Sequence, residues 1–137
     1  MIFLAVHLKG QENNVSTDYA TAHRLLLNHQ FTSCENFSKN ADLTRVERVY
    51  LNSLSGFMQL HLQGADAEFQ NYIENTRKRL SAIENRQDKE AQFTQAVVLF
   101  QSSVSHARFK QYFTAVINFR KAYKLTHKLV QQYPEYM

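Results

Sequence analysis

The sequence predicts an all-α fold. The chain has 137 residues but only three glycines and one proline, whereas a strand-rich fold needs frequent turns built on such residues. Apolar residues recur at helical spacing along most of the chain. With 44% apolar and 20% charged residues, the composition is that of an ordinary globular domain. We therefore predict a single all-α domain over residues 1–137, with about five antiparallel helices arranged as stacked helical hairpins or as a compact bundle.

The first predicted helix begins near residue 16, where Ser16 or Thr17 can cap its free amide groups. One face of this helix carries Tyr19, Ala22, Leu26 and His29. The following stretch "TSCENFSKN" is interpreted as a polar connection between helices.

A helical hairpin is predicted near residues 42–84. Its first helix, over about 42–62, ends before Gly64, and Asp66 is the expected N-cap of the second. The first helix has an apolar stripe of Leu43, Val46, Tyr50, Leu54 and Phe57. The second has a stripe of Phe69, Tyr72, Ile73, Thr76, Leu80 and Ile83, which is typical of an amphipathic helix.

Another hairpin is predicted near residues 89–133, with Asp88 as the N-cap of its first helix. That helix has the expected buried stripe Phe93, Ala96, Val97, Phe100, Val104 and Ala107. Pro134 ends the second helix, because a proline and the residue before it resist helical continuation.

The last helix separates apolar from basic residues. At 100° per residue, its apolar residues fall within roughly 140° and its basic residues within roughly 100° on the other side. The apolar set is Tyr112, Ala115, Val116, Phe119, Ala122, Tyr123, Leu129, Val130 and Tyr133. We expect this set to face the core and the basic set to face solvent. Phe113 and Ile117 lie beside the basic residues, where they are either exposed or packed under a neighbouring helix.

The net charge of +4 lies in the last third of the chain. Residues 1–90 have a net charge of −1, whereas residues 91–137 have a net charge of +5, with Glu135 as their only acid. The candidate face for an anionic partner consists of Lys110, Arg120, Lys121, Lys124 and Lys128. Such a stripe is either a solvated helix face or a contact surface for a polyanion.

Residues 95–134 resemble a tetratricopeptide-type helical repeat. Five residues carry the resemblance as helix-crossing positions: Ser103, Tyr112, Ala115, Phe119 and Ala122. In this family small residues pack where the two helices of a repeat cross. The sequence departs from the family pattern at Leu99, which replaces the usual Trp, and at Pro134, which follows Ala122 by twelve residues. The resemblance implies a divergent repeat with a concave surface for peptides or proteins.

Few residues suggest catalysis or metal binding. Six histidines occur without an HxxxH or HExxH arrangement, so a site built from His23, His29 and Cys34 is a remote alternative to scattered histidines. One cysteine excludes an intrachain disulfide. Three isolated glycines cannot form a phosphate-binding loop. We predict no enzyme activity, no cofactor and no bound metal.

The leading functional hypothesis is a non-catalytic module for protein–protein interaction or structural scaffolding, with a protein or peptide partner. The alternative is binding of a nucleic acid or another anionic surface through the basic face. The apolar run at residues 2–6 is too short to span a membrane and lacks a basic start. We expect a cytoplasmic protein, of either this length or a longer repeat array, and the sequence leaves its oligomeric state open.

Overall fold

The computed structural model describes residues 16–136, which are helical throughout apart from short connections. The all-α prediction is confirmed, with six α-helices rather than five in this part of the chain. They are α2 (Thr17–Leu27), α3 (Phe31–Asn40), α4 (Arg45–Gln63), α5 (Asp66–Ser81), α6 (Lys89–Arg108) and α7 (Tyr112–Gln132), followed by the 3₁₀ helix η1 (Pro134–Tyr136). Residues 2–6 lie outside the described part.

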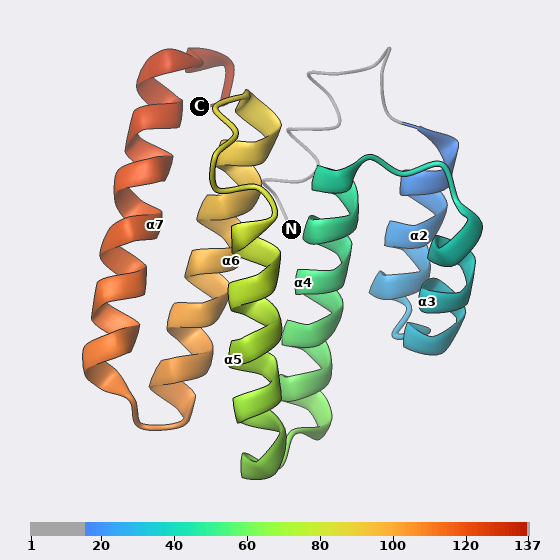
Figure 1. Cartoon of the computed structure of the whole chain (residues 1–137), viewed down its shortest axis with the longest axis horizontal. Helices are drawn as coiled ribbons and strands as arrows, with labels where there is room; N and C mark the ends of the chain where they lie inside the picture. Colours follow the sequence, from blue (N-terminus) through green and yellow to red (C-terminus); the bar gives the residue numbers. More distant parts are fainter. Residues whose placement is uncertain (1–15, 137) are drawn as a thin grey trace.

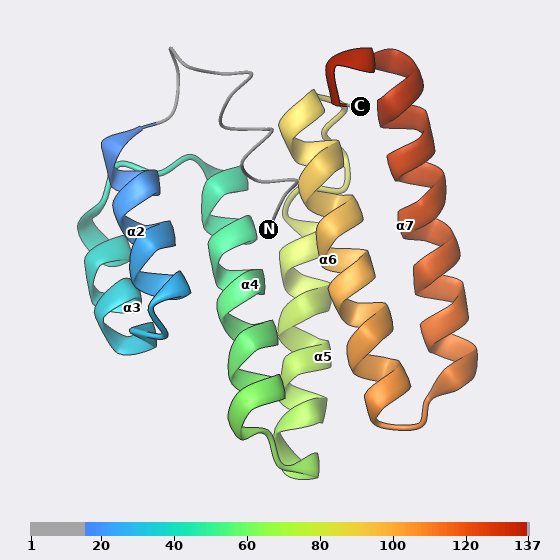
Figure 2. The ribbon, with the colours of Figure 1, turned by 180° about the vertical axis from the view of Figure 1, so that it is seen from behind.

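The helices form three consecutive hairpins, α2–α3, α4–α5 and α6–α7 (Figures 1 and 2). The first helices of the hairpins lie beside one another, because α4 contacts both α2 and α6. Helix α5 also contacts α6. Helix α7 lies at one side of the molecule and packs chiefly against α6. The fold therefore has two central helices, α4 and α6. At one side of the molecule, the outer surface of the α6–α7 hairpin is not covered by another described helix.

Polar side chains begin three of the helices. The Ser16 hydroxyl accepts a hydrogen bond from the Tyr19 amide at 3.1 Å. Thr44 and Glu47 form a capping box at the start of α4, and the Asp88 carboxylate accepts from the Ala91 amide at 3.3 Å. These bonds satisfy amides that have no partner within the helix. The expectation for Asp66 is wrong by one position, because Ala65 is the N-cap and Asp66 lies in the first turn.

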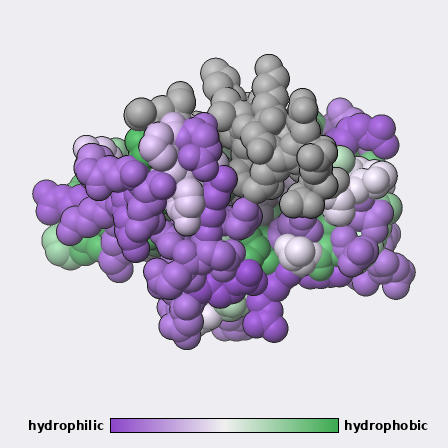
Figure 3. Space-filling model, turned by 90° about the horizontal axis from the view of Figure 1, so that it is seen from above, coloured by the Kyte–Doolittle hydropathy of each residue, from purple (hydrophilic) through white to green (hydrophobic). Residues whose placement is uncertain are grey.

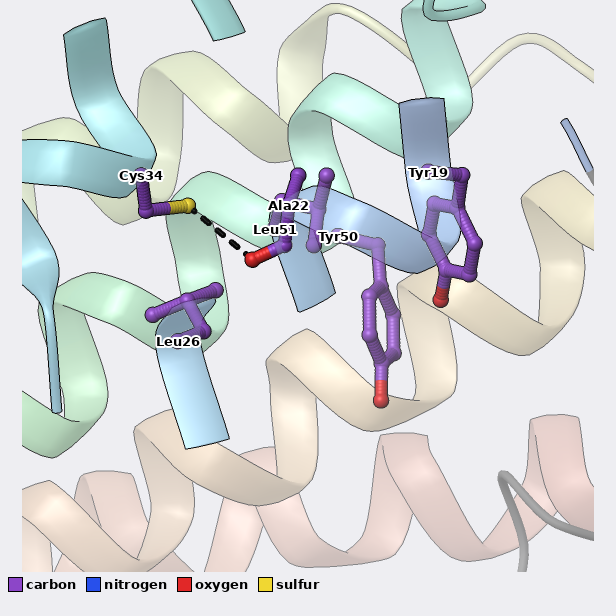
Figure 4. Packing of buried hydrophobic residues seen from close by; sticks show 6 residues of the cluster. All are labelled: Tyr19, Ala22, Leu26, Cys34, Tyr50 and Leu51. Carbon is purple, nitrogen blue, oxygen red and sulfur yellow. Dashed lines mark hydrogen bonds between the residues drawn. The ribbon is translucent and has the colours of Figure 1, made fainter. Parts of the chain in front are cut away.

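The segment interpreted as a polar connection is mostly helix α3, and that interpretation is wrong. Phe31, Cys34 and Phe37 recur every three residues and pack on the core formed with α2 and α4. The buried Cys34 thiol donates to the Ala22 carbonyl oxygen at 3.3 Å (Figure 4). His29, expected on the buried face of the first helix, lies beyond the end of α2 and is exposed. Three apolar residues hold this otherwise polar helix together with the Arg48 guanidinium of α4, which donates to the Ser38 and Ala41 carbonyl oxygens.

The predicted buried stripe of α6 is only partly correct. Ala96 is buried, but Phe100, Val104 and Ala107 are exposed. The buried residues of this helix are largely polar: Gln92, Thr94, Gln101, Ser102, Ser103, Ser105 and His106. Because α4, α5 and α7 surround α6, its polar side chains are covered, and several of them bond to α4 or α7: Gln101, Ser102, Ser103 and Ser105.

Two hydrogen bonds between side chains join α4 to α6. The Ser53 hydroxyl donates to the Gln101 side-chain oxygen at 2.7 Å, and His61 Nε2 lies 3.1 Å from the Ser105 hydroxyl. Each bond spans more than forty residues of sequence. Apolar periodicity in one helix cannot predict such pairs, since each member gains its partner only after the helices pack.

Candidate functional site

The α6–α7 hairpin has a fixed register. The Ser103 hydroxyl donates to the Ala115 carbonyl oxygen at 2.8 Å, and the Asn118 amide donates to the Ser102 hydroxyl at 3.1 Å. At the other end, the Lys89 ammonium group lies 3.1 Å from the Glu135 carboxylate. These contacts hold the two helices side by side along their length.

The turn between the two helices is a tight helix-ending motif. Lys110 has a positive φ of 62°, its amide donates to the Ala107 carbonyl at 3.1 Å, and the Gln111 amide donates to the His106 carbonyl at 2.8 Å. This is the Schellman arrangement, in which a left-handed residue closes a helix. Lys110, predicted on the basic face of the last helix, thus lies in the turn before it.

Three of the five predicted helix-crossing residues are buried between α6 and α7. They are Ser103, Ala115 and Ala122, all less than 10% exposed. Tyr112 and Phe119 are instead 63% and 49% exposed. Phe119 does contact α6, since its ring centroid lies 6.4 Å from that of Phe100. The small residues allow the two helices to pack closely, whereas the two aromatic residues lie at the edge of the contact between the helices.

The apolar arc of the last helix is expected to face the core. This expectation is wrong for four of its residues, which are exposed: Tyr112, Val116, Phe119 and Tyr123. The buried residues of α7 are Ala115, Ala122 and Leu129, and Val130 and Tyr133 are half-buried. The reason is positional: one helix, α6, covers α7, and the contact takes up only a narrow strip of its surface. An apolar arc predicts burial only where a neighbour is present to bury it.

The exposed apolar residues of this hairpin form one continuous surface, which we call the α6–α7 apolar face. On α7, Tyr112, Val116, Phe119 and Tyr123 follow one another at intervals of four, three and four residues and therefore share one side of the helix. Phe100 and Val104 extend the surface onto α6. The side of the molecule seen from above is mostly hydrophilic with smaller hydrophobic areas (Figure 3).

The apolar face is large for a protein surface. Aromatic side chains cover about 150–250 Å² each when buried, so these half-exposed residues together offer on the order of several hundred Å². That is comparable with the largest apolar patch on a typical monomer, about 300–600 Å², which is often functional. Two further apolar residues, Phe113 and Ile117, lie next to the face on α7 and are 81% and 37% exposed.

Basic residues follow the apolar residues on α7, where Arg120 lies four residues after Val116 and Lys121 four after Ile117. Arg120, Lys121, Lys124 and Lys128 are all exposed, and we call them the basic rim. The ion pairs of residues 16–136 are Lys78–Glu74, Arg86–Asp88 and Lys89–Glu135, and none involves the rim. The structure thus places exposed rings and exposed cations on adjacent strips of one helix. From the sequence we instead expected these rings to face the core, away from the cations.

A cluster of titratable side chains lies inside the fold, between α4, α5 and α6. The Arg79 guanidinium is partly buried beside Gly56, where an added Cβ would lie 2.9 Å from its Nη1 atom. Burial lowers the pKa of Arg79 and raises the pKa of the neighbouring Tyr72 phenol. Burial and the nearby Arg108 guanidinium lower the pKa of His61.

The remote histidine–cysteine metal site does not form. Within residues 16–136, no group of three His, Cys, Asp or Glu side chains is arranged to hold a metal ion. His29 is exposed, whereas Cys34 is buried, donates to a backbone carbonyl and has its pKa raised by burial.

Comparison with known proteins gives no assignment: the chain has no significant match to a protein-family model, to a curated protein or to a solved structure. Among the described helices, none combines the length and the apolar character needed to cross a membrane.

Proposed function

We propose that this chain is a non-catalytic helical-hairpin module that binds a protein partner through the α6–α7 apolar face. The observation that carries the proposal is a run of half-exposed aromatic and aliphatic residues on a hairpin that is otherwise well fixed. Leaving such a surface in water costs free energy, about 25 cal/mol for each Å² that a partner could bury. A rigid, exposed apolar strip is therefore suited to contact another protein.

The arrangement of three consecutive hairpins supports a divergent, tetratricopeptide-like repeat. In the row α2–α4–α6, the first helix of each hairpin contacts the first helix of the next, and α5 contacts α6. Stacked repeats bury each hairpin against its neighbours, and the exposed apolar face of α6–α7 is a surface that a neighbouring hairpin or a protein partner would cover. The same contacts also occur in compact bundles, and a structural scaffold in the cytoplasm fits the proposal equally well.

Site-specific photo-crosslinking in cells tests the proposed function. A photoreactive phenylalanine analogue placed at Phe119 should give protein adducts of discrete mass, because that side chain lies in the middle of the apolar face. The same analogue at Arg77, an exposed position on α5, is the matched control and should give none. Equal adducts at the two positions, or none at Phe119, would contradict the proposal.

The structure also favours a second candidate function more than the sequence did. Exposed rings next to exposed cations are the combination that binds single-stranded nucleic acid, and Phe113, Tyr123, Lys121 and Lys124 supply it. Titration of the protein with single-stranded DNA at rising salt tests this candidate. A steep loss of affinity with salt, abolished by the triple change Lys121→Gln, Lys124→Gln and Lys128→Gln, would support it.

A further inference from the structure

Helix α7 presents two parallel strips of side chains to solvent. One strip is Tyr112, Val116, Phe119 and Tyr123, and it is apolar throughout. The adjacent strip begins with Phe113 and Ile117 and continues as the basic rim. Side chains four residues apart form the ridges that pack into the grooves of another helix. The apolar strip spans about 16 Å at 1.5 Å per residue, which is a suitable length for a helix of three to four turns.

The chemistry of the strips changes along α7. The end near the turn to α6 is apolar on both strips, whereas the following turns are apolar on one strip and cationic on the other. Because no ion pair among residues 16–136 involves the rim cations, their charges are free to meet carboxylates of a partner. Opposed charges across an interface fix its register and suppress wrong partners.

We propose that the α6–α7 apolar face binds an acidic amphipathic helix, and this rests on the proposed protein-binding function. Apolar residues of the partner, spaced at i, i+3/i+4 and i+7, pack against Tyr112, Val116, Phe119 and Tyr123. Aspartate or glutamate residues along one edge of the partner face the basic rim. The rim cations lie between the middle of α7 and its C-terminal end, so the acids of the partner are concentrated toward the corresponding end of its helix.

Charge argues against a second copy of this chain as the occupant. In a two-fold dimer the same patch contacts itself. A parallel pairing of two α7 helices places Lys124 and Lys128 beside their own copies, and an antiparallel pairing places them beside Phe113 and Ile117 of the other copy. Neither pairing supplies the rim with acids, since Glu135 is the only acid of residues 91–137 and already contacts Lys89.

Aliphatic residues argue against single-stranded nucleic acid as the main occupant. Bases stack on flat rings, but Val104, Val116 and Ile117 interrupt the rings with branched side chains. Two of the rings also have neighbours already. Phe119 contacts Phe100, and Tyr123 stacks on His127 with ring centroids 6.1 Å apart. An apolar strip in which branched side chains alternate with rings fits the side chains of a helix better than a stack of bases.

Selection from a displayed helix library tests the proposal. Each library helix has a fixed leucine stripe, and Glu, Gln or Lys is randomised at the positions along its two edges. Selection on the purified protein should enrich Glu at the edge positions toward one end of the helix. Selected helices, made as peptides, should bind several-fold to about tenfold more weakly when salt rises from 50 to 300 mM, because exposed ion pairs are screened.

Three variants make the outcome specific. The rim variant Lys121→Gln, Lys124→Gln, Lys128→Gln should lose the preference for Glu. The control variant Arg24→Gln, Lys39→Gln, Arg77→Gln removes three exposed charges elsewhere and should keep it. The double change Phe113→Ser, Tyr123→Ser alters two highly exposed side chains, so it should abolish binding while circular dichroism confirms that the protein remains folded.

The possible outcomes separate the inference from the proposed function. Helices that bind the face but show no preference for Glu would overturn the acidic partner and leave protein binding intact. If the double Ser variant binds the selected helices as well as the wild type, the face is not the binding site and both proposals fail. Dimers in sedimentation that the double Ser variant abolishes would identify a second copy as the occupant. Tighter binding of single-stranded DNA than of any selected helix would assign the face to nucleic acid.

Discussion

At the scale of single residues, two helix ends of this protein use left-handed residues that are not glycine. His29 and Lys110 have φ values of 58° and 62°, and each follows a helix whose last carbonyls accept hydrogen bonds from the turn. A side chain with a Cβ atom pays roughly 1–2 kcal/mol for this conformation. These two turns therefore contain strain that glycine would relieve.

Lys110→Gly should stabilise the protein by about 0.5–1 kcal/mol, since the strain relieved is partly offset by the greater freedom of glycine in the unfolded chain. Chemical denaturation at neutral pH measures the change. Lys110→Ala is the control, because it removes the same charge but keeps the Cβ atom. If Lys110→Ala stabilises as much as Lys110→Gly, the effect comes from charge and not from the backbone.

The cap residue Asp88 gives a prediction that depends on pH. A hydrogen bond from Arg86 and another from the Ala91 amide lower the pKa of this carboxyl in the folded protein. Its contribution to stability is therefore present above its ordinary pKa of about 3.9 and is lost as pH falls through the lower folded value. Asp88→Ala should cost about 0.5–2 kcal/mol at pH 7.

The difference between wild type and Asp88→Ala should shrink as denaturation is repeated at pH values below about 4, because the unfolded chain then binds a proton at Asp88 that the folded protein binds only at lower pH. Asp88→Asn retains a capping oxygen and serves as the control, with a smaller loss at pH 7. A difference that is the same at pH 7 and pH 3 would show that the carboxylate charge contributes nothing at this helix end.

At the scale of helices, the α6–α7 contact depends on small residues. Ala115 and Ala122 are buried against α6, and Ser103 bonds to the Ala115 carbonyl. Ala115→Leu or Ala122→Leu should destabilise the protein by roughly 1–3 kcal/mol, because the larger side chain forces closely packed helices apart. Thermal unfolding checks this, with Val116→Leu as the exposed neighbour that should change stability little.

The same hairpin shows what the sequence could and could not predict. Ala115 and Ala122 are predicted at the helix crossing and are buried, and Asp88 is the predicted and the observed N-cap of α6. Phe100, Phe119 and Tyr123 were placed in the core because periodicity identifies an apolar side of a helix but not whether a neighbour covers it. Helix α3 was missed because only three apolar residues identify its buried face.

The sequence predicts the cations of the basic rim, but only the structure shows that their neighbouring rings are exposed. Segregated cations on a helix usually form a solvated face when the opposite side is buried. Here the rings beside Arg120 and Lys124 are themselves exposed, so the cations border an apolar surface. That relation depends on the position of α7 at the side of the molecule, which no local pattern encodes.

At the scale of the whole molecule, the packing of the helices against one another predicts a gradient of local stability. Helices α4 and α6 each pack against several others, whereas α3 packs mainly on α2 and α7 mainly on α6. Helices supported from one side open with less free energy than those supported from several. We therefore expect amide hydrogens in the middle of α4 and α6 to exchange most slowly, with α3 and α7 exchanging faster.

Hydrogen exchange followed by mass spectrometry measures this gradient and connects it to binding. A selected acidic helix should slow exchange in α7 and in the part of α6 around Phe100, while α2 and α3 keep their rates, because only the covered hairpin gains contacts. The Phe113→Ser, Tyr123→Ser variant should show the same gradient without ligand and no slowing with it. If α7 in the free protein exchanges as slowly as α4, the hairpin is supported by contacts beyond α6, and its apolar face is less accessible than its exposed side chains indicate.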